Sequence, residues 1–108
     1  MKHRVLVIAA HPDDARSHIY YGIELAQVGR IDEARSEIVK ALELSPGDPL
    51  MLYNAACCYS RIGEKKQAVK SLRESVLAGL EDYEWIKTDP DFDSLREEPE
   101  YIELMKGK

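Results

Sequence analysis

Apolar side chains recur at intervals of three and four residues through most of the chain, which is the period of an amphipathic α-helix. Four such segments predict helices, at residues 15–28, 31–44, 49–62 and 65–78. Asp14 and Asp48 stand where a side chain can cap the first and third helices. Gly29 and Gly63 stand where a left-handed residue ends a helix. The pattern therefore predicts two helical hairpins, each closed by a turn that contains glycine.

The two predicted hairpins repeat each other in sequence. The shift that aligns Gly29 with Gly63 also aligns Ala34 with Ala68. The same shift pairs further small or apolar positions, namely Leu25 with Tyr59, Ile38 with Leu72 and Gly22 with Ala56. Small residues at a helix crossing let two backbones approach closely. Since one hairpin cannot bury its apolar face alone, we expect the two units to stack.

This repeat resembles the tetratricopeptide repeat, which places small and large residues at fixed points of a unit of about 34 residues. The first unit matches that pattern with Gly22, Leu25, Ala34, Ile38, Ala41 and Pro46, and the second with Ala56, Tyr59, Ala68, Leu72 and Ser75. His18 stands where the family often has Trp, and Leu80 replaces the closing Pro of the second unit. The resemblance implies an all-α fold, an α-solenoid of two full units at residues 15–48 and 49–82.

Residues 83–108 resemble an ending seen after tetratricopeptide repeats in bacterial and archaeal proteins. Apolar residues are separated there by Pro and Asp, at Trp85, Ile86, Phe92, Leu95, Ile102 and Met105. Short helices carrying these anchors would cover the open end of the stack. We therefore predict a helical C-terminal cap in which Trp85 is buried, so that its replacement by Ala would lower stability by about 3 kcal/mol.

Residues 1–14 precede the first complete unit. Pro12 precedes Pro46 by one repeat length, so it is in register with the repeat. We therefore expect this segment to be a partial preceding helix followed by an inter-repeat loop. The β-branched residues of the apolar run from Val5 to Ala10 weaken the helix prediction. A strand or a tail borrowed by a neighbouring protomer remains an alternative.

The sequence His-Pro-Asp-Asp before the first helix resembles the metal loop of zinc-dependent sugar-amide deacetylases. By that resemblance His11 and Asp14 would bind zinc and Asp13 would act as the base. Three features oppose a working site: Ala15 replaces the Glu of that family, no His follows His18, and the rest of the chain is predicted to be helical. A truncated or fused deacetylase-like enzyme is therefore the alternative function, and we expect no catalytic residue, metal or cofactor.

Three alternating carboxylates, Asp89, Asp91 and Asp93, are similar to the start of a calcium loop. Pro90 and Phe92 interrupt this alternation, and no Gly stands at the sixth position. We therefore expect a solvated acidic turn that caps a helix.

Composition narrows the class of partner. The chain has 108 residues, 44% of them hydrophobic, with a net charge of −5, and residues 81–108 hold ten acids against four bases. Nucleic acid and membrane surfaces require basic patches, which are missing. No apolar run approaches the roughly 20 residues of a membrane-spanning helix. Cys57 and Cys58 are adjacent on one helix, which does not suit a disulfide framework, and we expect a cytoplasmic protein with reduced thiols.

The tetratricopeptide resemblance implies a concave groove lined by the first helix of each unit. The corresponding positions are Arg16, Ile19, Ile23, Ala26 and Gln27, followed by Leu50, Tyr53, Asn54, Cys57, Ser60 and Arg61. An amphipathic helix or an extended peptide could place apolar anchors in this groove. We therefore predict a non-catalytic protein–protein interaction scaffold. The groove could instead pack against the N-terminal segment or another copy, which would make the chain a self-associating structural module.

Overall fold

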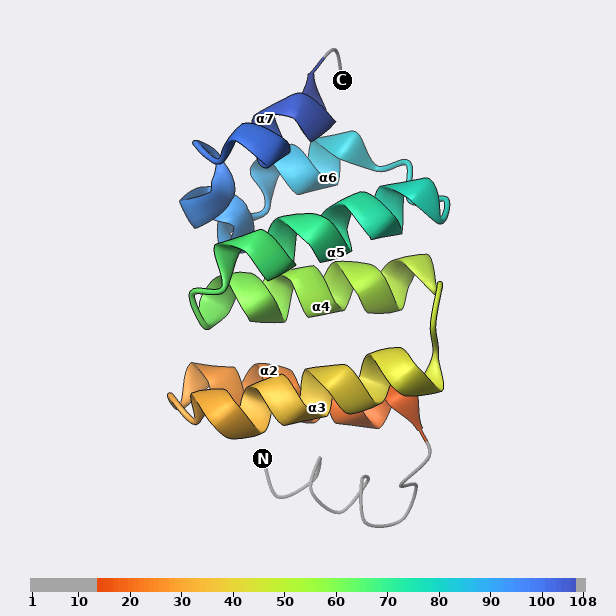
Figure 1. Ribbon diagram of the computed structural model, residues 1–108, viewed down its shortest axis with the longest axis vertical. Coiled ribbons are helices and arrows are strands. Elements are labelled where there is room, and N and C mark those ends of the chain that lie inside the picture. Colours follow the sequence, from red (N-terminus) through yellow and green to blue (C-terminus); the bar gives the residue numbers. More distant parts are fainter. Residues whose placement is uncertain (1–13, 107–108) are drawn as a thin grey trace.

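A computed structural model describes residues 14–106 of the chain, and every regular element in that range is a helix. In chain order the elements are α2 (Ala15–Gln27), α3 (Ile31–Leu44), α4 (Pro49–Arg61), α5 (Lys65–Leu77), α6 (Tyr83–Thr88), the 3₁₀ helix η1 (Pro90–Leu95) and α7 (Pro99–Met105) (Figure 1). The all-α prediction is therefore confirmed for this part of the chain. None of the described helices is both long and apolar enough to cross a bilayer. The expectations for residues 1–13, including those for His11 and Asp13, lie outside the described residues.

Local signals in the sequence set the helix boundaries. The Asp14 side chain caps α2 by accepting a hydrogen bond from the Arg16 backbone N at 3.0 Å. Asp48 caps α4 in the same way through the Leu50 backbone N, also at 3.0 Å. Gly29 follows α2 with a φ of +83°, a backbone conformation that residues other than glycine rarely adopt. The four long helices lie within one residue of their predicted boundaries.

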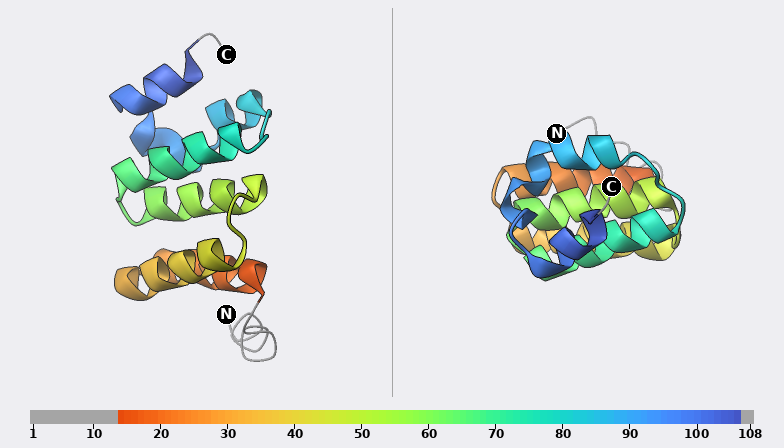
Figure 2. Two further views of the ribbon diagram at one scale, coloured as in Figure 1. Left: turned by 45° about the vertical axis from the view of Figure 1, so that its right-hand side comes forward. Right: turned by 90° about the horizontal axis from the view of Figure 1, so that it is seen from above.

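Two helical hairpins stack along the long axis of the molecule, α2 with α3 and α4 with α5 (Figures 1 and 2). α4 is the central element, since it contacts α2 and α3 of the first hairpin as well as α5. Within the first hairpin, Gly22 lies against α3, and a Cβ built on it would stand 3.4 Å from both the Ala34 carbonyl oxygen and the Glu37 Cβ. The close crossing of α2 and α3, which we predicted from the small residues, is therefore present.

Polar contacts accompany the packing within and between the hairpins. Inside the first hairpin, His18 Nδ1 lies 2.6 Å from a Glu37 carboxylate oxygen, and both residues are buried. Between the hairpins, Arg35 of α3 donates through Nε to Glu64 at 2.6 Å. Arg35 also bonds Asp32 on its own helix, at 2.9 Å. The bonds of Arg35 connect the end of the α4–α5 turn to the first hairpin.

The C-terminal segment, defined as residues 83–106, packs onto the second hairpin. η1 contacts α4 and α5, and α7 contacts α5. The buried side chains of the C-terminal segment are Ile86, Phe92 and Leu95, which have no exposed surface, and Tyr101, which is 5% exposed. The segment is helical, as predicted, and its apolar residues join the main core around α4.

Two predicted anchors of this segment are exposed. Trp85 is 50% exposed, so the prediction that it is buried is wrong. Ile102, named as another apolar anchor, is 53% exposed. Neighbouring residues on a helix point about 100° apart, so a short helix that buries one apolar residue exposes the next. In α6 the buried position is taken by Ile86, and in α7 it is taken by Tyr101. Trp85 keeps a partial contact, with its ring centroid 5.2 Å from that of Tyr53.

The close approach at Gly22 gives a first prediction. Gly22→Ala should be tolerated or slightly stabilising, because its Cβ meets ordinary contacts and Ala favours helix by about 1 kcal/mol over Gly. Gly22→Val should destabilise by about 1–3 kcal/mol, because its methyl groups overpack the crossing with α3. Urea denaturation of the two variants measures both values, and equal stabilities would contradict the close crossing.

A second prediction separates the buried anchors of the C-terminal segment from the exposed one. Phe92→Ala should lower the free energy of unfolding by about 3–5 kcal/mol, because it removes a fully buried ring. Trp85→Ala should cost less than about 2 kcal/mol, because half of the indole is already in water. Thermal denaturation followed by circular dichroism compares them, and a larger loss for Trp85→Ala would place that side chain in the core after all.

Candidate functional site

The predicted groove residues of α2 lie on one helix face but differ in exposure. Arg16 and Gln27 are exposed, Ile23 and Ala26 are partly buried, and Ile19 is completely buried. Ile19 therefore contributes to the core, whereas the ends of α2 offer polar groups to the surface.

The predicted groove residues of α4 divide into an open end and a covered end. Leu50 is 56% exposed and Asn54 is partly buried, so both are accessible near the start of the helix. Tyr53, which stands between Leu50 and Asn54, is buried, and so are Cys57 and Ser60 farther along the helix. Since α2 contacts α4, the predicted residues of both helices belong to one region, but the later part of α4 is covered.

η1 and its flanking residues cover that part of α4. The Tyr53 hydroxyl donates a hydrogen bond to the Asp89 carboxylate, and the Ser60 hydroxyl donates to the Asp91 carbonyl oxygen. Arg61 forms a bidentate pair with the Asp91 carboxylate, at 2.9 Å from Nε and 3.3 Å from Nη2. These side chains therefore bind a segment of their own chain.

An aromatic contact reinforces the same junction. Phe92 meets the Tyr53 ring edge-on, with centroids 5.4 Å apart and planes at 86°. The Trp85 ring lies against Tyr53 as well. Edge-to-face pairs of this kind add favourable energy to the area that they bury. Tyr53 is thus the point at which α6, η1 and α4 meet.

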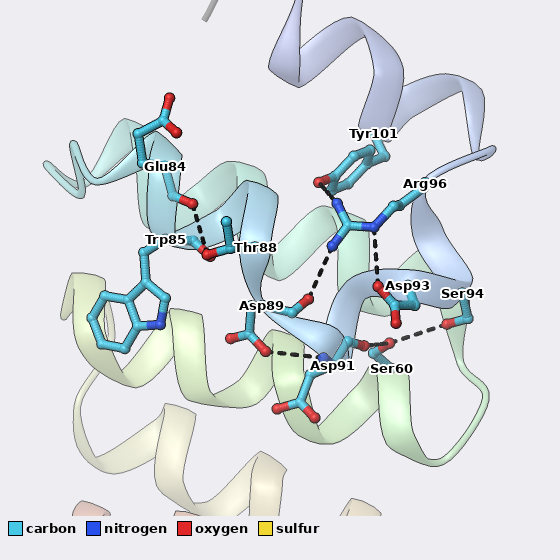
Figure 3. Close-up of polar contacts among 10 residues, drawn as sticks. All are labelled: Ser60, Glu84, Trp85, Thr88, Asp89, Asp91, Asp93, Ser94, Arg96 and Tyr101. Atoms are coloured by element: carbon cyan, nitrogen blue, oxygen red, sulfur yellow. Dashed lines mark hydrogen bonds and ion pairs between the residues drawn. The ribbon is translucent and has the colours of Figure 1, made fainter.

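The acidic turn is held by its own polar network, which Figure 3 shows. Asp89 caps η1 by accepting from the Asp91 backbone N at 2.9 Å. Arg96 donates to the Asp89 carbonyl oxygen at 3.2 Å and to the Asp93 carboxylate at 3.1 Å. Ser94 lies 3.2 Å from the Ser60 hydroxyl. The expected capping role is confirmed, but Asp89 and Asp91 bond to α4, so the turn is less solvated than expected.

The junction favours the neutral forms of the Tyr53 phenol and the Cys57 thiol. Burial raises the pKa of Tyr53, and the hydrogen bond to Asp89 raises it further. Burial also raises the pKa of Cys57, to which the charges of Asp89 and Asp91 add. Because a carboxylate accepts and a neutral hydroxyl donates, the Tyr53–Asp89 bond needs the phenol to keep its proton.

A metal ion would have to compete with these bonds. Cys57, Asp89 and Asp91 bring potential ligand atoms within 4.8 Å of one another. The Asp91 carboxylate is already paired with Arg61, and Asp89 accepts the Tyr53 hydroxyl. A thiol binds metal as the thiolate, whereas the raised pKa of Cys57 favours the protonated form. The arrangement therefore suits internal hydrogen bonding better than metal binding.

The described part of the His-Pro-Asp-Asp sequence has a structural role. Asp14, which the deacetylase resemblance makes a zinc ligand, uses its carboxylate to cap α2. The deacetylase resemblance finds no support in the helical fold of residues 14–106.

An open cleft lies between the N-terminal ends of α2 and α4. Its lining includes Arg16 and Tyr20 from α2, Leu50 and Asn54 from α4, and the two capping carboxylates Asp14 and Asp48. Tyr20 is 38% exposed. It was not among the predicted groove residues, although it precedes Asn54 by one repeat length and the repeat register could have found it.

The buried thiols of α4 give a third prediction. Burial raises the pKa of Cys58 from 9.0 to about 12, so above pH 9 the unfolded chain loses a proton that the folded chain keeps. Stability should therefore fall between pH 9 and 12, by at most about 1.4 kcal/mol per pH unit for this thiol. Urea denaturation at pH 7.5 and 10.5 measures the loss, and Cys58→Ala should reduce it. Equal losses in both proteins would exclude this thiol as a cause.

Comparison with known proteins agrees with the geometry. The family model of the tetratricopeptide repeat matches residues 50–78, which span most of the second hairpin. A chloroplastic protein of Arabidopsis thaliana is 32% identical over 88 residues. That alignment covers 79% of this chain but 26% of the relative, so the chain spans about a quarter of its length. No solved structure matches the chain. The repeat match and the stacked helical hairpins identify the chain as a tetratricopeptide-repeat protein.

Proposed function

We propose that this chain is a non-catalytic interaction scaffold that binds a peptide or helix of a partner protein on the face shared by α2 and α4. The tetratricopeptide repeat suggests a protein-interaction module. The observation that carries the proposal is the cleft between these helices, where apolar Leu50 is 56% exposed next to the amide of Asn54.

The accessible residues of the predicted groove have the chemistry that such binding requires. Leu50 offers an apolar contact, and Asn54 can donate and accept hydrogen bonds with a peptide backbone. Arg16 and Gln27 add polar contacts at the two ends of α2. Among the other predicted groove residues, Ile19 belongs to the hydrophobic core and Ile23 packs against it. Tyr53, Cys57 and Arg61 bind the C-terminal segment.

The same proposal includes the cellular compartment of the protein and the chemical class of its partner. Cys57 and Cys58 are free thiols, which agrees with a reducing compartment such as the cytoplasm. The acidic net charge of −5 disfavours nucleic acid as the partner. We therefore place the partner among proteins.

A capture experiment with matched variants tests this function. The double variant Leu50→Ala/Asn54→Ala should lose partners that the wild-type chain captures from a lysate, because truncating central contacts weakens binding by roughly tenfold or more. Leu77→Ala is the control, since Leu77 is 79% exposed on α5 and does not line the cleft. Quantitative mass spectrometry compares the captured proteins. Identical protein lists for the double variant and the control would refute the assignment of the face.

Self-association through this face, or through the apolar N-terminal segment, is the alternative, because exposed apolar side chains could also pair with a second copy. Light scattering over a hundredfold range of concentration distinguishes the two. A mass that stays at 12.3 kDa would exclude self-association over that range.

A further inference from the structure

The exposed half of Trp85 has a place in the proposed binding face. Trp85 packs on Tyr53 of α4. Leu50 and Asn54, which stand on either side of Tyr53 in the same helix, both line the cleft. In Figure 3 the indole extends away from the network of Asp91, Arg96 and Tyr101. The contact with Tyr53 therefore supports the tryptophan and leaves half of its surface for another molecule.

Tyr20, Leu50 and Asn54 line the cleft, and Trp85 packs on Tyr53, which stands between Leu50 and Asn54 on α4. We call these four side chains, Tyr20, Leu50, Asn54 and Trp85, the Trp85 face. They come from three different helices, α2, α4 and α6. Three of them are large apolar or aromatic side chains with 38–56% of their surface exposed. Exposed Trp and Tyr are typical of the residues that dominate binding energy at protein interfaces.

Negative charge borders this face at both ends. Asp14 and Asp48 line the cleft between α2 and α4 together with the cation Arg16, so carboxylates outnumber guanidinium groups there. At the other end, Asp89 and Asp91 lie where η1 crosses α4, and Asp91 already neutralises Arg61. Beyond the face, residues 81–108 carry a net charge of −6, from ten acids and four bases. The field over the surface therefore favours a cation and repels an anion.

Aromatic rings and carboxylates together define the chemistry of the partner. The face of a Trp or Tyr ring attracts an Arg or Lys side chain by a cation–π interaction. A neighbouring carboxylate stabilises the same charge, and Leu50 can contact an apolar anchor. Acidic peptides and nucleic acids would meet repulsion here.

We infer, on the basis of the proposed function, that the Trp85 face selects a basic segment of its protein partner, in which Lys or Arg adjoins an apolar side chain. Trp85 and Tyr20 are then binding residues in addition to the predicted groove residues. The Tyr53 junction serves as the support that fixes the indole in place.

The test selects a randomised twelve-residue peptide library, displayed on phage, against the immobilised full chain. The enriched peptides should carry an excess of Lys and Arg beside aromatic or aliphatic residues. Their synthetic forms should shift the fluorescence of Trp85, the one tryptophan of the chain. Their Kd should rise several-fold between 50 and 300 mM NaCl, because the attraction is screened.

Matched variants assign the binding to residues. Trp85→Ala and Tyr20→Ala should each raise the Kd of a selected peptide by about tenfold, measured by calorimetry. Trp85→Phe should restore part of the affinity, because a smaller aromatic ring remains. Ile102→Ala is the control, since Ile102 is 53% exposed on α7. If Trp85→Ala does not fold, the comparison of Trp85→Phe with Tyr20→Ala carries the test.

Several outcomes would overturn the inference. Enrichment of acidic or uncharged peptides would refute the charge selection, and unchanged affinity for Trp85→Ala would refute the role of the indole. A library that yields no enriched peptide would also count against it. The proposed function fails separately, if the partners captured from a lysate do not depend on Leu50 and Asn54.

Discussion

The packing of α4 on nearly every side is the constraint on which this fold depends. α4 contacts α2, α3, α5 and η1, and nine of its 13 residues are buried. Small side chains make this possible, since Ala55, Ala56, Cys57 and Cys58 leave room for neighbouring backbones. Most of the stability of such a helix comes from tertiary packing rather than from helix propensity. The two hairpins and the C-terminal segment are therefore organised around one helix.

Burial of α4 also decides where polar groups must find partners. Tyr53 and Ser60 are buried, and a buried hydroxyl without a partner costs free energy. The turn around η1 supplies those partners, through the Asp89 carboxylate and the Asp91 carbonyl oxygen. Groups that a tetratricopeptide groove could offer to a ligand are thus used within the molecule. The accessible surface is shifted toward α2 and the start of α4.

Much of this architecture could be predicted from the sequence, because its signals are local. Apolar periodicity and the caps Asp14 and Asp48 define the long helices, and Gly22 indicates a close helix crossing. The exposure of Trp85 was not predictable, since the sequence places it beside Ile86 and either could face the core.

The candidate site was predictable only in part. The repeat register indicated the faces of α2 and α4, and it could have indicated Tyr20 as the counterpart of Asn54. The contact between Tyr53 and Asp89 joins residues 36 positions apart. No local pattern connects them, so the covering of the groove at one end could not be read from the sequence.

The position of η1 limits how this array can be lengthened by protein engineering. A hairpin appended after α5 would compete with η1 and α7 for the surface of α5. A hairpin inserted between Leu44 and Pro49 would instead leave the last unit and its covering segment together. Such an insertion would extend the open surface while the polar residues of α4 keep their partners.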